Sequence, residues 1–222
     1  MPLRIDLHVH SDSSGDGISS ISEIVKIAKA KGLDGVAITD HDLVLDRETA
    51  ARITRESGIL VIGGVEVSAK EGHVLVFDPK RKFPEGTPIQ DIVQNALEEG
   101  SAVVISHPTD PLSHGVGSVV VKSLSHLRMP LEVLNSSTMH RYNLGASILA
   151  DELSLPKCGG SDAHLAEAVG DAFTVVEASS CSLEDVVDAI RKGRVAPGGS
   201  QTKKSLAAKT VLKRIGKYAN LK

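Results

Sequence analysis

The sequence predicts an α/β fold in which parallel strands are joined by helical crossovers. Short apolar runs that are typical of strands alternate along the chain with amphipathic segments that are typical of helices. The length of 222 residues allows one α/β barrel or two small domains, and no linker composition favours two. Hydrophobic residues make up 41% of the chain, which is enough for one sizeable core.

Eight apolar runs predict the strands, at residues 3–9, 33–39, 59–67, 74–77, 102–106, 131–134, 156–159 and 173–176. In the first run, apolar and polar residues alternate, so Asp6, His8 and His10 lie on one face of the strand. Apolar spacing, together with serine or aspartate before the segment or glycine after it, predicts the helices between these runs. They are expected at residues 20 or 22 to 31, 46–57, 88–99, 119–127, 143–153 and 183–192.

The composition excludes several classes of protein. No apolar run approaches the roughly 20 residues of a membrane span, and the start lacks a basic region followed by an apolar stretch, so we expect a cytoplasmic protein. Cys158 and Cys181 are the only cysteines, which supports neither a disulfide framework nor a thiolate zinc site. We expect both to be small buried residues.

The net charge of −3 conceals a basic segment at residues 203–222, which holds seven Lys or Arg residues and no acid. The other 202 residues carry 18 basic and 28 acidic side chains. Such an acidic body, with no Trp, three Phe and two Tyr, offers few surfaces on which bases could stack. A role in nucleic-acid binding therefore depends on this basic tail.

Possible metal ligands follow the predicted strands with unusual regularity. Functional groups of a parallel α/β barrel lie at the carboxyl ends of its strands, where the connecting loops meet. His73 instead begins the fourth run, and it reaches the same rim if that strand is antiparallel after a tight turn at Gly72. The other candidate ligands, at the strand ends or in the loops that follow, are His8, His10, Asp16, His41, Glu66, His107, Asp162 and His164.

This donor set predicts a site for two or three divalent ions. Three carboxylates contribute −3 and neutral imidazoles contribute nothing, so two ions leave a charge of about +1 and three leave about +3. The charge of about +3 that remains with three ions can be balanced by a bridging hydroxide and an anionic substrate. Nitrogen and oxygen ligands without thiolate suit zinc, manganese or iron(II) better than magnesium.

The ordered motifs resemble the polymerase and histidinol phosphatase (PHP) superfamily of metal-dependent phosphoesterases. The motifs are Asp6-Leu7-His8-Val9-His10, Thr39-Asp40-His41-Asp42, Gly64-Val65-Glu66, Gly72-His73, His107-Pro108 and Gly160-Ser161-Asp162-Ala163-His164. The resemblance runs from about residue 3 to 200 and implies a distorted seven-stranded (β/α) barrel with its metal site at the C-terminal rim of the strands. The phosphoesterase domain is thus expected at residues 1–202, followed by a basic amphipathic helix or tail at 203–222.

The resemblance also implies how the ligands are shared among up to three ions. His8, His10, Glu66 and Asp162 resemble the ligands of the first. Glu66, His73 and His107 resemble those of the second, and Asp16, His41 and His164 those of the third. A hydroxide bridging the first two ions is the expected nucleophile, with the third binding a phosphate oxygen. Asp162 or His164 could move the proton.

Four further residues are candidates around this centre. Asp6 and Asp40 could orient metal-bound imidazoles, or could serve only as capping or solvated loop carboxylates. Asn135 and Arg141 resemble positions that contact substrate in related phosphoesterases, and the alternative for Arg141 is a surface arginine after a turn. Outside the candidates, His114 and His126 follow no strand and are expected to face solvent or to pack.

The leading hypothesis is a phosphatase or phosphodiesterase acting on nucleotide-like or other small phosphorylated molecules. The alternatives are a nuclease that trims the 5′ ends of RNA or DNA, a histidinol-phosphate-type phosphatase, and a metal-binding or interaction module without activity. The tail at 203–222 could be a helix docked on the barrel or a basic arm that steers an oligonucleotide. Substrate specificity resides in variable loops such as residues 109–118.

Overall fold

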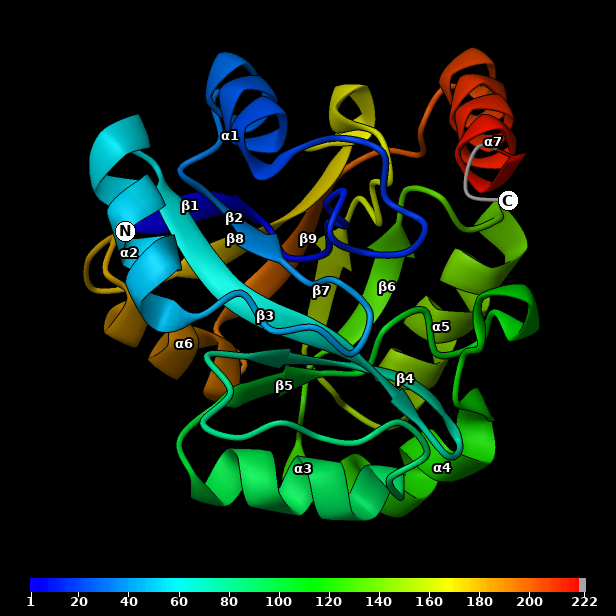
Figure 1. Cartoon of the computed structure of the whole chain (residues 1–222). Coiled ribbons are helices and arrows are strands. Elements are labelled where there is room, and N and C mark those ends of the chain that lie inside the picture. The colour runs from blue at the N-terminus through cyan, green and yellow to red at the C-terminus, as the bar shows by residue number, and fades with distance from the viewer. Residues whose placement is uncertain (220–222) are drawn as a thin grey trace.

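A curled sheet of seven strands and a separate pair of strands form the centre of the molecule in a computed structural model of the chain (Figure 1). The structure describes residues 1–219, so the last three residues of the predicted tail, including Lys222, lie outside the described part. Within that part the strands are β1 (Pro2–Asp6), β2 (Gly35–Ile38), β3 (Leu60–Ala69), β4 (Gly72–Phe77), β5 (Ala102–Val104), β6 (Leu131–Asn135), β7 (Lys157–Gly160), β8 (Ala172–Glu177) and β9 (Val195–Gly199).

The strand directions differ in part from the predicted all-parallel arrangement. The large sheet has the order β5, β4, β3, β2, β1, β8, β9, and its only parallel pairs are β1 with β2 and β2 with β3. β4 is antiparallel to both β3 and β5, as its expected turn at Gly72 requires. β8 is antiparallel to β1 and β9, and the sequence analysis missed β9 because its residues, Val195–Gly199, form no apolar run.

The parallel pair of β6 and β7 lies across the open side of the half-barrel that the large sheet forms (Figure 1). A parallel bridge between Ile105 and Leu131 connects this pair to the end of β5. The prediction of a distorted (β/α) barrel is thus confirmed, with the strands divided between two sheets. The ends of β1, β3, β6 and β7 converge on one rim.

The helices begin and end close to the predicted residues because local signals define their limits. Ser20 forms a capping box with Glu23 at the start of α1, and Asp46 accepts from the Thr49 N–H at the start of α2. Gly58, with φ of 77°, ends α2. The α-helices are α1 (Ile21–Ala30), α2 (Arg47–Ser57), α3 (Ile89–Glu98), α4 (Gly117–Leu124), α5 (His140–Glu152), α6 (Leu183–Arg191) and α7 (Lys204–Ala219).

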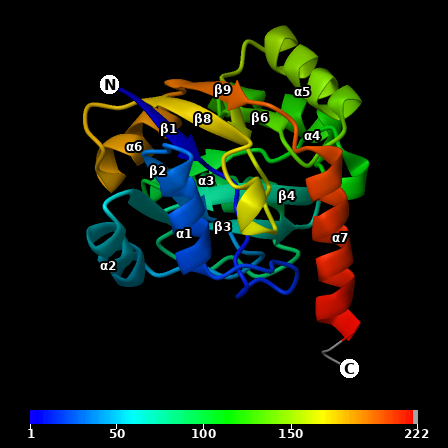
Figure 2. The same ribbon diagram turned by 90° about the horizontal axis from the view of Figure 1, so that it is seen from above.

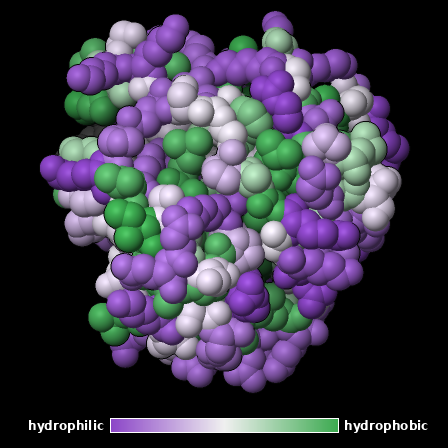
Figure 3. All heavy atoms as spheres, turned by 180° about the vertical axis from the view of Figure 1, so that it is seen from behind, coloured by the Kyte–Doolittle hydropathy of each residue, from purple (hydrophilic) through white to green (hydrophobic). Residues whose placement is uncertain are grey.

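Hydrophobic side chains fill both faces of the large sheet. Ile5, Ile38 and Ile62 of the central strands are fully buried. Cys158 is buried in this core as expected, whereas Cys181 is exposed, contrary to the prediction, because it precedes α6 at the surface. In the described part of the chain no helix combines the length and the apolar character that crossing a membrane needs. From behind, hydrophobic side chains are scattered in small groups among hydrophilic ones (Figure 3).

Helix α7 stands apart from the other helices, at one side of the molecule, in both ribbon views (Figures 1 and 2). Leu206 packs against the core that α1 and β2 share. Lys209 forms an ion pair with Glu167 at 2.6 Å, and Lys217 donates to backbone carbonyls of the loop after β1. The final helix is therefore docked on the same rim where the strand ends converge.

Candidate metal centre

The chain segments that follow the strands are held side by side by backbone contacts between distant residues. After β1, the His10 N–H donates to Ala163 O at 2.9 Å, and the Asp162 N–H donates to His8 O at 2.8 Å. His41 and Glu66 form another parallel bridge. These contacts extend the strand pairing past the regular sheet, so that candidate ligands from both halves of the chain face one space.

Glu66 lies at the centre of the imidazoles. Its Oε2 is 3.2 Å from His8 Nε2, 3.3 Å from His10 Nε2 and 3.4 Å from His41 Nδ1. Its Oε1 is 2.9 Å from His107 Nε2 and 3.2 Å from His73 Nδ1. One buried carboxylate thus faces five histidines, with one oxygen directed toward each group of rings.

Asp162 and Asp16 complete the set on the other side of His10. Asp162 Oδ1 is 3.3 Å from His10 Nε2 and 3.6 Å from His8 Nε2. Asp16 Oδ2 is 2.7 Å from His164 Nε2 and 3.6 Å from His41 Nε2. Each of the nine predicted ligands belongs to at least one group whose donor atoms lie within 4.8 Å of one another.

In His8 and His164, a hydrogen bond from one ring nitrogen leaves the other nitrogen, which faces the cluster, available as a metal ligand. His8 Nδ1 donates to Glu132 Oε1 at 3.0 Å, and His164 Nδ1 donates to the Asp162 carbonyl at 3.0 Å. In a neutral imidazole the other nitrogen, Nε2, then carries the lone pair. In both rings Nε2 is the atom that faces the carboxylates of the cluster.

The carboxylates and the imidazoles shift one another's pKa. Burial alone would lower the pKa of His8, but the neighbouring carboxylates, Glu66 first, hold it well above its usual range. Contacts with Asp162 and Glu66 likewise outweigh burial at His10 and raise its pKa to about 9. Burial would raise the pKa of Glu66, yet the imidazoles hold it well below its usual range. The carboxylates therefore stay ionised and attract positive charge to this space.

The donor set fits divalent metal ions. His8 Nε2 and both ring nitrogens of His10 are buried without a hydrogen-bond partner among the described residues, although carboxylate oxygens lie near them. Leaving buried imidazole nitrogens unpaired is costly unless something binds them. Buried imidazole nitrogens and carboxylate oxygens, without thiolate, are the ligand types of zinc, manganese and iron(II).

Asp6 and Asp40 bind the backbone rather than the imidazole rings. Asp6 accepts from the N–H groups of Ser161 at 2.9 Å and Gly170 at 2.7 Å, and burial raises its pKa to about 6. Asp40 accepts from the N–H and the hydroxyl of Ser11, both at 2.6 Å. The prediction that these carboxylates orient the rings is corrected, because both are occupied in fixing the loops that carry the ligands.

Asn135 and Arg141 also differ from the predicted substrate contacts. Asn135 is completely buried, and its Nδ2 donates to Glu132 Oε2 at 3.0 Å and to Asp162 Oδ2 at 3.2 Å. Arg141 is exposed and lies over the ring of its neighbour Tyr142. Asn135 thus positions carboxylates, whereas Arg141 is an exposed arginine whose guanidinium contacts Tyr142.

A cavity of about 860 Å³ opens above the cluster. The loops 112–114 and 136–140 form two of its walls, and α7 forms another. Lys204 and Arg214 of the basic tail also line the cavity, although no pattern in the sequence predicted these two residues individually as part of the site. His114 also lines the cavity, with its ring centroid 5.1 Å from that of His73, whereas His126 is exposed as expected.

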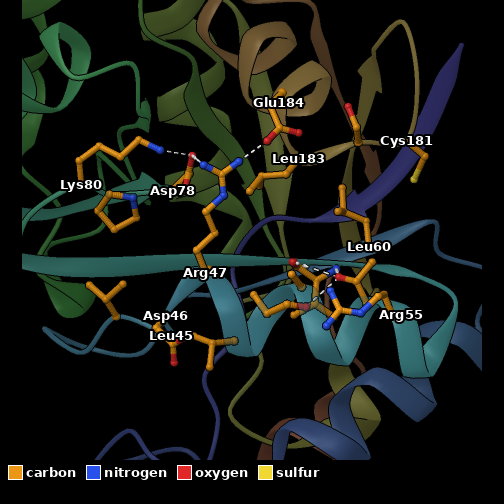
Figure 4. A pocket seen from close by; sticks show the side chains of 18 of the residues that line it. Leu45, Asp46, Arg47, Arg55, Leu60, Asp78, Lys80, Cys181, Leu183 and Glu184 are labelled. Atoms are coloured by element: carbon orange, nitrogen blue, oxygen red, sulfur yellow. Dashed lines mark hydrogen bonds and ion pairs between the residues drawn. The ribbon is translucent and has the colours of Figure 1, made fainter.

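A second cavity, of about 600 Å³, lies between α2 and α6 (Figure 4). Its lining, taken from the described residues, includes no histidine. Arg47 pairs with Glu184, and Lys80 pairs with Asp78, as the dashed lines in Figure 4 mark. Two of its cationic side chains are thus paired with acids of the same lining, in contrast to the unpaired nitrogens of the cluster.

Comparison with known proteins agrees with this geometry. The family model of a PHP-associated domain matches residues 140–195. A probable phosphatase from Aeromonas hydrophila is 28% identical over 205 residues, which cover 77% of this chain and 82% of that protein. A 5′-3′ exoribonuclease from Haemophilus influenzae is 37% identical over 109 residues, which cover 47% of this chain but only 39% of the exoribonuclease.

The fold is similar to that of a solved two-domain protein from Bacteroides vulgatus containing a predicted PHP-like metal-dependent phosphoesterase. The TM-score is 0.69 at 21% sequence identity, and the match covers 96% of this chain and 70% of that one. Family model, relatives and fold therefore confirm the resemblance that the sequence motifs predicted.

Proposed function

We propose that this chain, whose fold and relatives are those of the PHP superfamily of metal-dependent phosphoesterases, hydrolyses phosphoesters of small, nucleotide-like molecules. It holds two or three divalent ions, zinc, manganese or iron, at the rim of the strands. One observation carries the proposal. Nine nitrogen- and oxygen-bearing side chains, Glu66 among them, meet at the floor of an open cavity.

The ligands divide among the ions as the resemblance implies. His8, His10, Glu66 and Asp162 would hold the first, and Glu66 would also belong to the second. His73 and His107 would hold the second, and Asp16, His41 and His164 the third. Divalent ions bound there supply a hydroxide nucleophile near neutral pH and neutralise charge on the phosphate. The short distances from Glu66 to His8, His10, His73 and His107 support its shared position.

The chain's own residues position the rings and handle protons. Glu132 holds His8 with Nε2 directed inward, and the Asp162 carbonyl does the same for His164. His164 and the ionised Asp162 carboxylate lie at the cavity surface, where they can accept the proton of an attacking water. We assign them as the catalytic proton carriers.

An exonuclease acting on 5′ ends of RNA or DNA is the second candidate. The Haemophilus relative favours it over the part of the chain that matches, and the basic helix α7 beside the cavity is compatible with it. A histidinol-phosphate-type phosphatase has no observation of this kind behind it. A binding module without activity accounts poorly for a cavity that exposes a complete ligand set.

The test joins metal analysis to a screen for phosphate release. The purified chain, loaded with manganese or zinc, is assayed on mononucleotides, 3′,5′-bisphosphates, sugar and amino-alcohol phosphates and 5′-phosphorylated oligonucleotides. We expect turnover of a small phosphoester. The double variant His8→Ala with His10→Ala is expected to lose bound metal and at least about 1,000-fold in activity, since metal catalysis contributes several kcal/mol.

His126→Ala is the matched control, because this histidine is exposed and its ring contacts only the Ser123 carbonyl among the described residues. It should keep wild-type metal content and activity. Turnover restricted to oligonucleotides would select the nuclease. Unchanged metal content and activity in the double variant would refute the ligand assignment. Absence of turnover with every substrate would favour the binding module without activity.

A further inference from the structure

Among the described residues that line the main cavity, the only lysine and arginine side chains come from α7. They are Lys204 in its first turn and Arg214 ten residues later. Arg141, predicted to contact substrate, is not among the lining residues. A phosphorylated ligand entering the cavity therefore meets a guanidinium only at Arg214.

Arg214 reaches the cluster itself. Its Nη2 donates to Asp16 Oδ2 at 2.9 Å, the same oxygen that lies 2.7 Å from His164 Nε2. The side chain is 36% exposed, so one edge of the guanidinium contacts the cluster while another part remains accessible. A guanidinium carries five N–H donors in a planar fork that matches two phosphate oxygens.

Contacts on several sides hold the helix in place around Arg214. Lys217, one turn further on, donates to the carbonyl of Gly17 at 2.6 Å and to that of Ser14 at 3.0 Å. Those carbonyls belong to the loop that carries Asp16. At the other end of α7, Thr202 donates its N–H to Ser136 O at 3.0 Å and its hydroxyl to Asp171. Arg214 is thus presented by a supported helix rather than by a free tail.

The rest of the same wall suits the organic part of a phosphoester. Val211 lies one turn before Arg214 on the cavity side of α7, and Leu112 and Met139 line the cavity from the loops. These three side chains remain 56%, 67% and 49% exposed. Burying such apolar surface against a bound ligand is favourable.

We infer that α7 is the substrate-binding wall of the site and that Arg214 is its phosphate-binding residue, taking the role predicted for Arg141. The inference rests on the proposed function for its substrate class. The competing explanation is that Arg214 only neutralises Asp16 and docks the helix.

Direct binding of inorganic phosphate separates the two explanations. Isothermal titration of phosphate into the manganese-loaded full chain, at ionic strength matched with chloride, compares wild type with Arg214→Ala and Arg214→Lys. The control is Lys213→Ala, which removes the same charge from an exposed position on the same helix. Bound metal and melting temperature are measured for every variant.

Arg214→Ala is expected to weaken phosphate binding roughly 10- to 100-fold, because it removes hydrogen bonds to a charged group. Arg214→Lys should restore part of the loss, since it returns the charge but not the fork. Lys213→Ala should bind as wild type does. Phosphate affinity unchanged in Arg214→Ala, at normal metal content, overturns the inference. Because the titration needs no turnover, it gives a result even if the phosphoesterase proposal fails.

Discussion

Glu132, on strand β6, accepts hydrogen bonds from two of the histidines of the candidate metal centre and from Asn135. Its Oε1 accepts from His8 Nδ1, and its Oε2 accepts from the His107 N–H at 2.9 Å and from Asn135 Nδ2. A carboxylate that accepts from an imidazole fixes the orientation of the ring and makes its other nitrogen a better ligand. Glu132 therefore has the role that the sequence suggested for Asp6 and Asp40.

Glu132→Gln is expected to lower metal affinity roughly 10- to 100-fold, as loss of a partner of a metal-binding histidine commonly does. The amide nitrogen of Gln would meet N–H donors where the carboxylate accepted them. Competition with a chromophoric chelator measures the affinity, and circular dichroism checks the fold. Glu152→Gln, an exposed acid at the end of α5, is the control, and equal affinity in both variants would contradict the assignment.

Gly160 shows how closely the chain packs at this point. A Cβ built there would lie 2.6 Å from His8 Cβ and 2.7 Å from Glu132 Oε1. No side chain fits between β7 and the ring that Glu132 orients. The glycine of the Gly-Ser-Asp-Ala-His motif is thus required by the packing of the candidate metal centre.

At the scale of elements, α7 depends on charged contacts more than on apolar burial. Leu206 packs against the core, but Val211, Leu212 and Ile215 are exposed. Such a helix is held mainly by hydrogen bonds and ion pairs at the surface, and these contribute less stability than a buried face. We expect α7 to open locally while the barrel stays folded.

Lys217→Ala is predicted to increase opening of α7 about fivefold, because it removes hydrogen bonds from an ammonium to the loop after β1. Hydrogen exchange of residues 204–217, followed by mass spectrometry, measures the change. The melting temperature of the barrel should stay within a degree or so of wild type. Exchange as slow as in Lys213→Ala would show that Lys217 does not anchor the helix.

At the scale of the whole molecule, the centre assembles side chains that range from His8 to His164 in the sequence. Ions bound there would bridge the two halves of the chain, and a ligand that binds only the folded state stabilises it by mass action. Without them the buried carboxylates are compensated by protons on the imidazoles and, at Asp16, by Arg214.

Chelation followed by dialysis is expected to lower the melting temperature by about 5–10 °C. An ion at 100 times its Kd contributes about 2.7 kcal/mol, and each kcal/mol shifts a domain of this size by about 2–4 °C. Differential scanning calorimetry measures the shift, which added manganese or zinc should reverse. The variant with His8→Ala and His10→Ala should not respond to either treatment. An equal shift in that variant would assign the effect to ions bound elsewhere.

Much of this architecture could be predicted because its signals are local. The helices follow from caps such as Ser20 and Asp46, and the rule about strand ends names eight of the nine proposed ligands, with His73 added through the expected turn at Gly72. Strand direction beyond β4 could not be predicted, since alternation of elements does not distinguish a parallel neighbour from an antiparallel one. The contact between Arg214 and Asp16 could not be predicted either, because the two residues lie 198 positions apart and no sequence pattern connects them.

The central position of β1 affects the order in which the protein can be completed. β1 pairs with β2 on one side and with β8 on the other, although β8 is among the last strands to be synthesised. During translation that edge of β1 stays open until residues 172–177 have left the ribosome, and an open edge invites pairing with other chains. During the same interval His8 and His10 lack the partners Asp162 and His164, which are synthesised later. The candidate centre can thus form only after Asp162 and His164 have been synthesised, and one edge of β1 stays unpaired until β8 follows them.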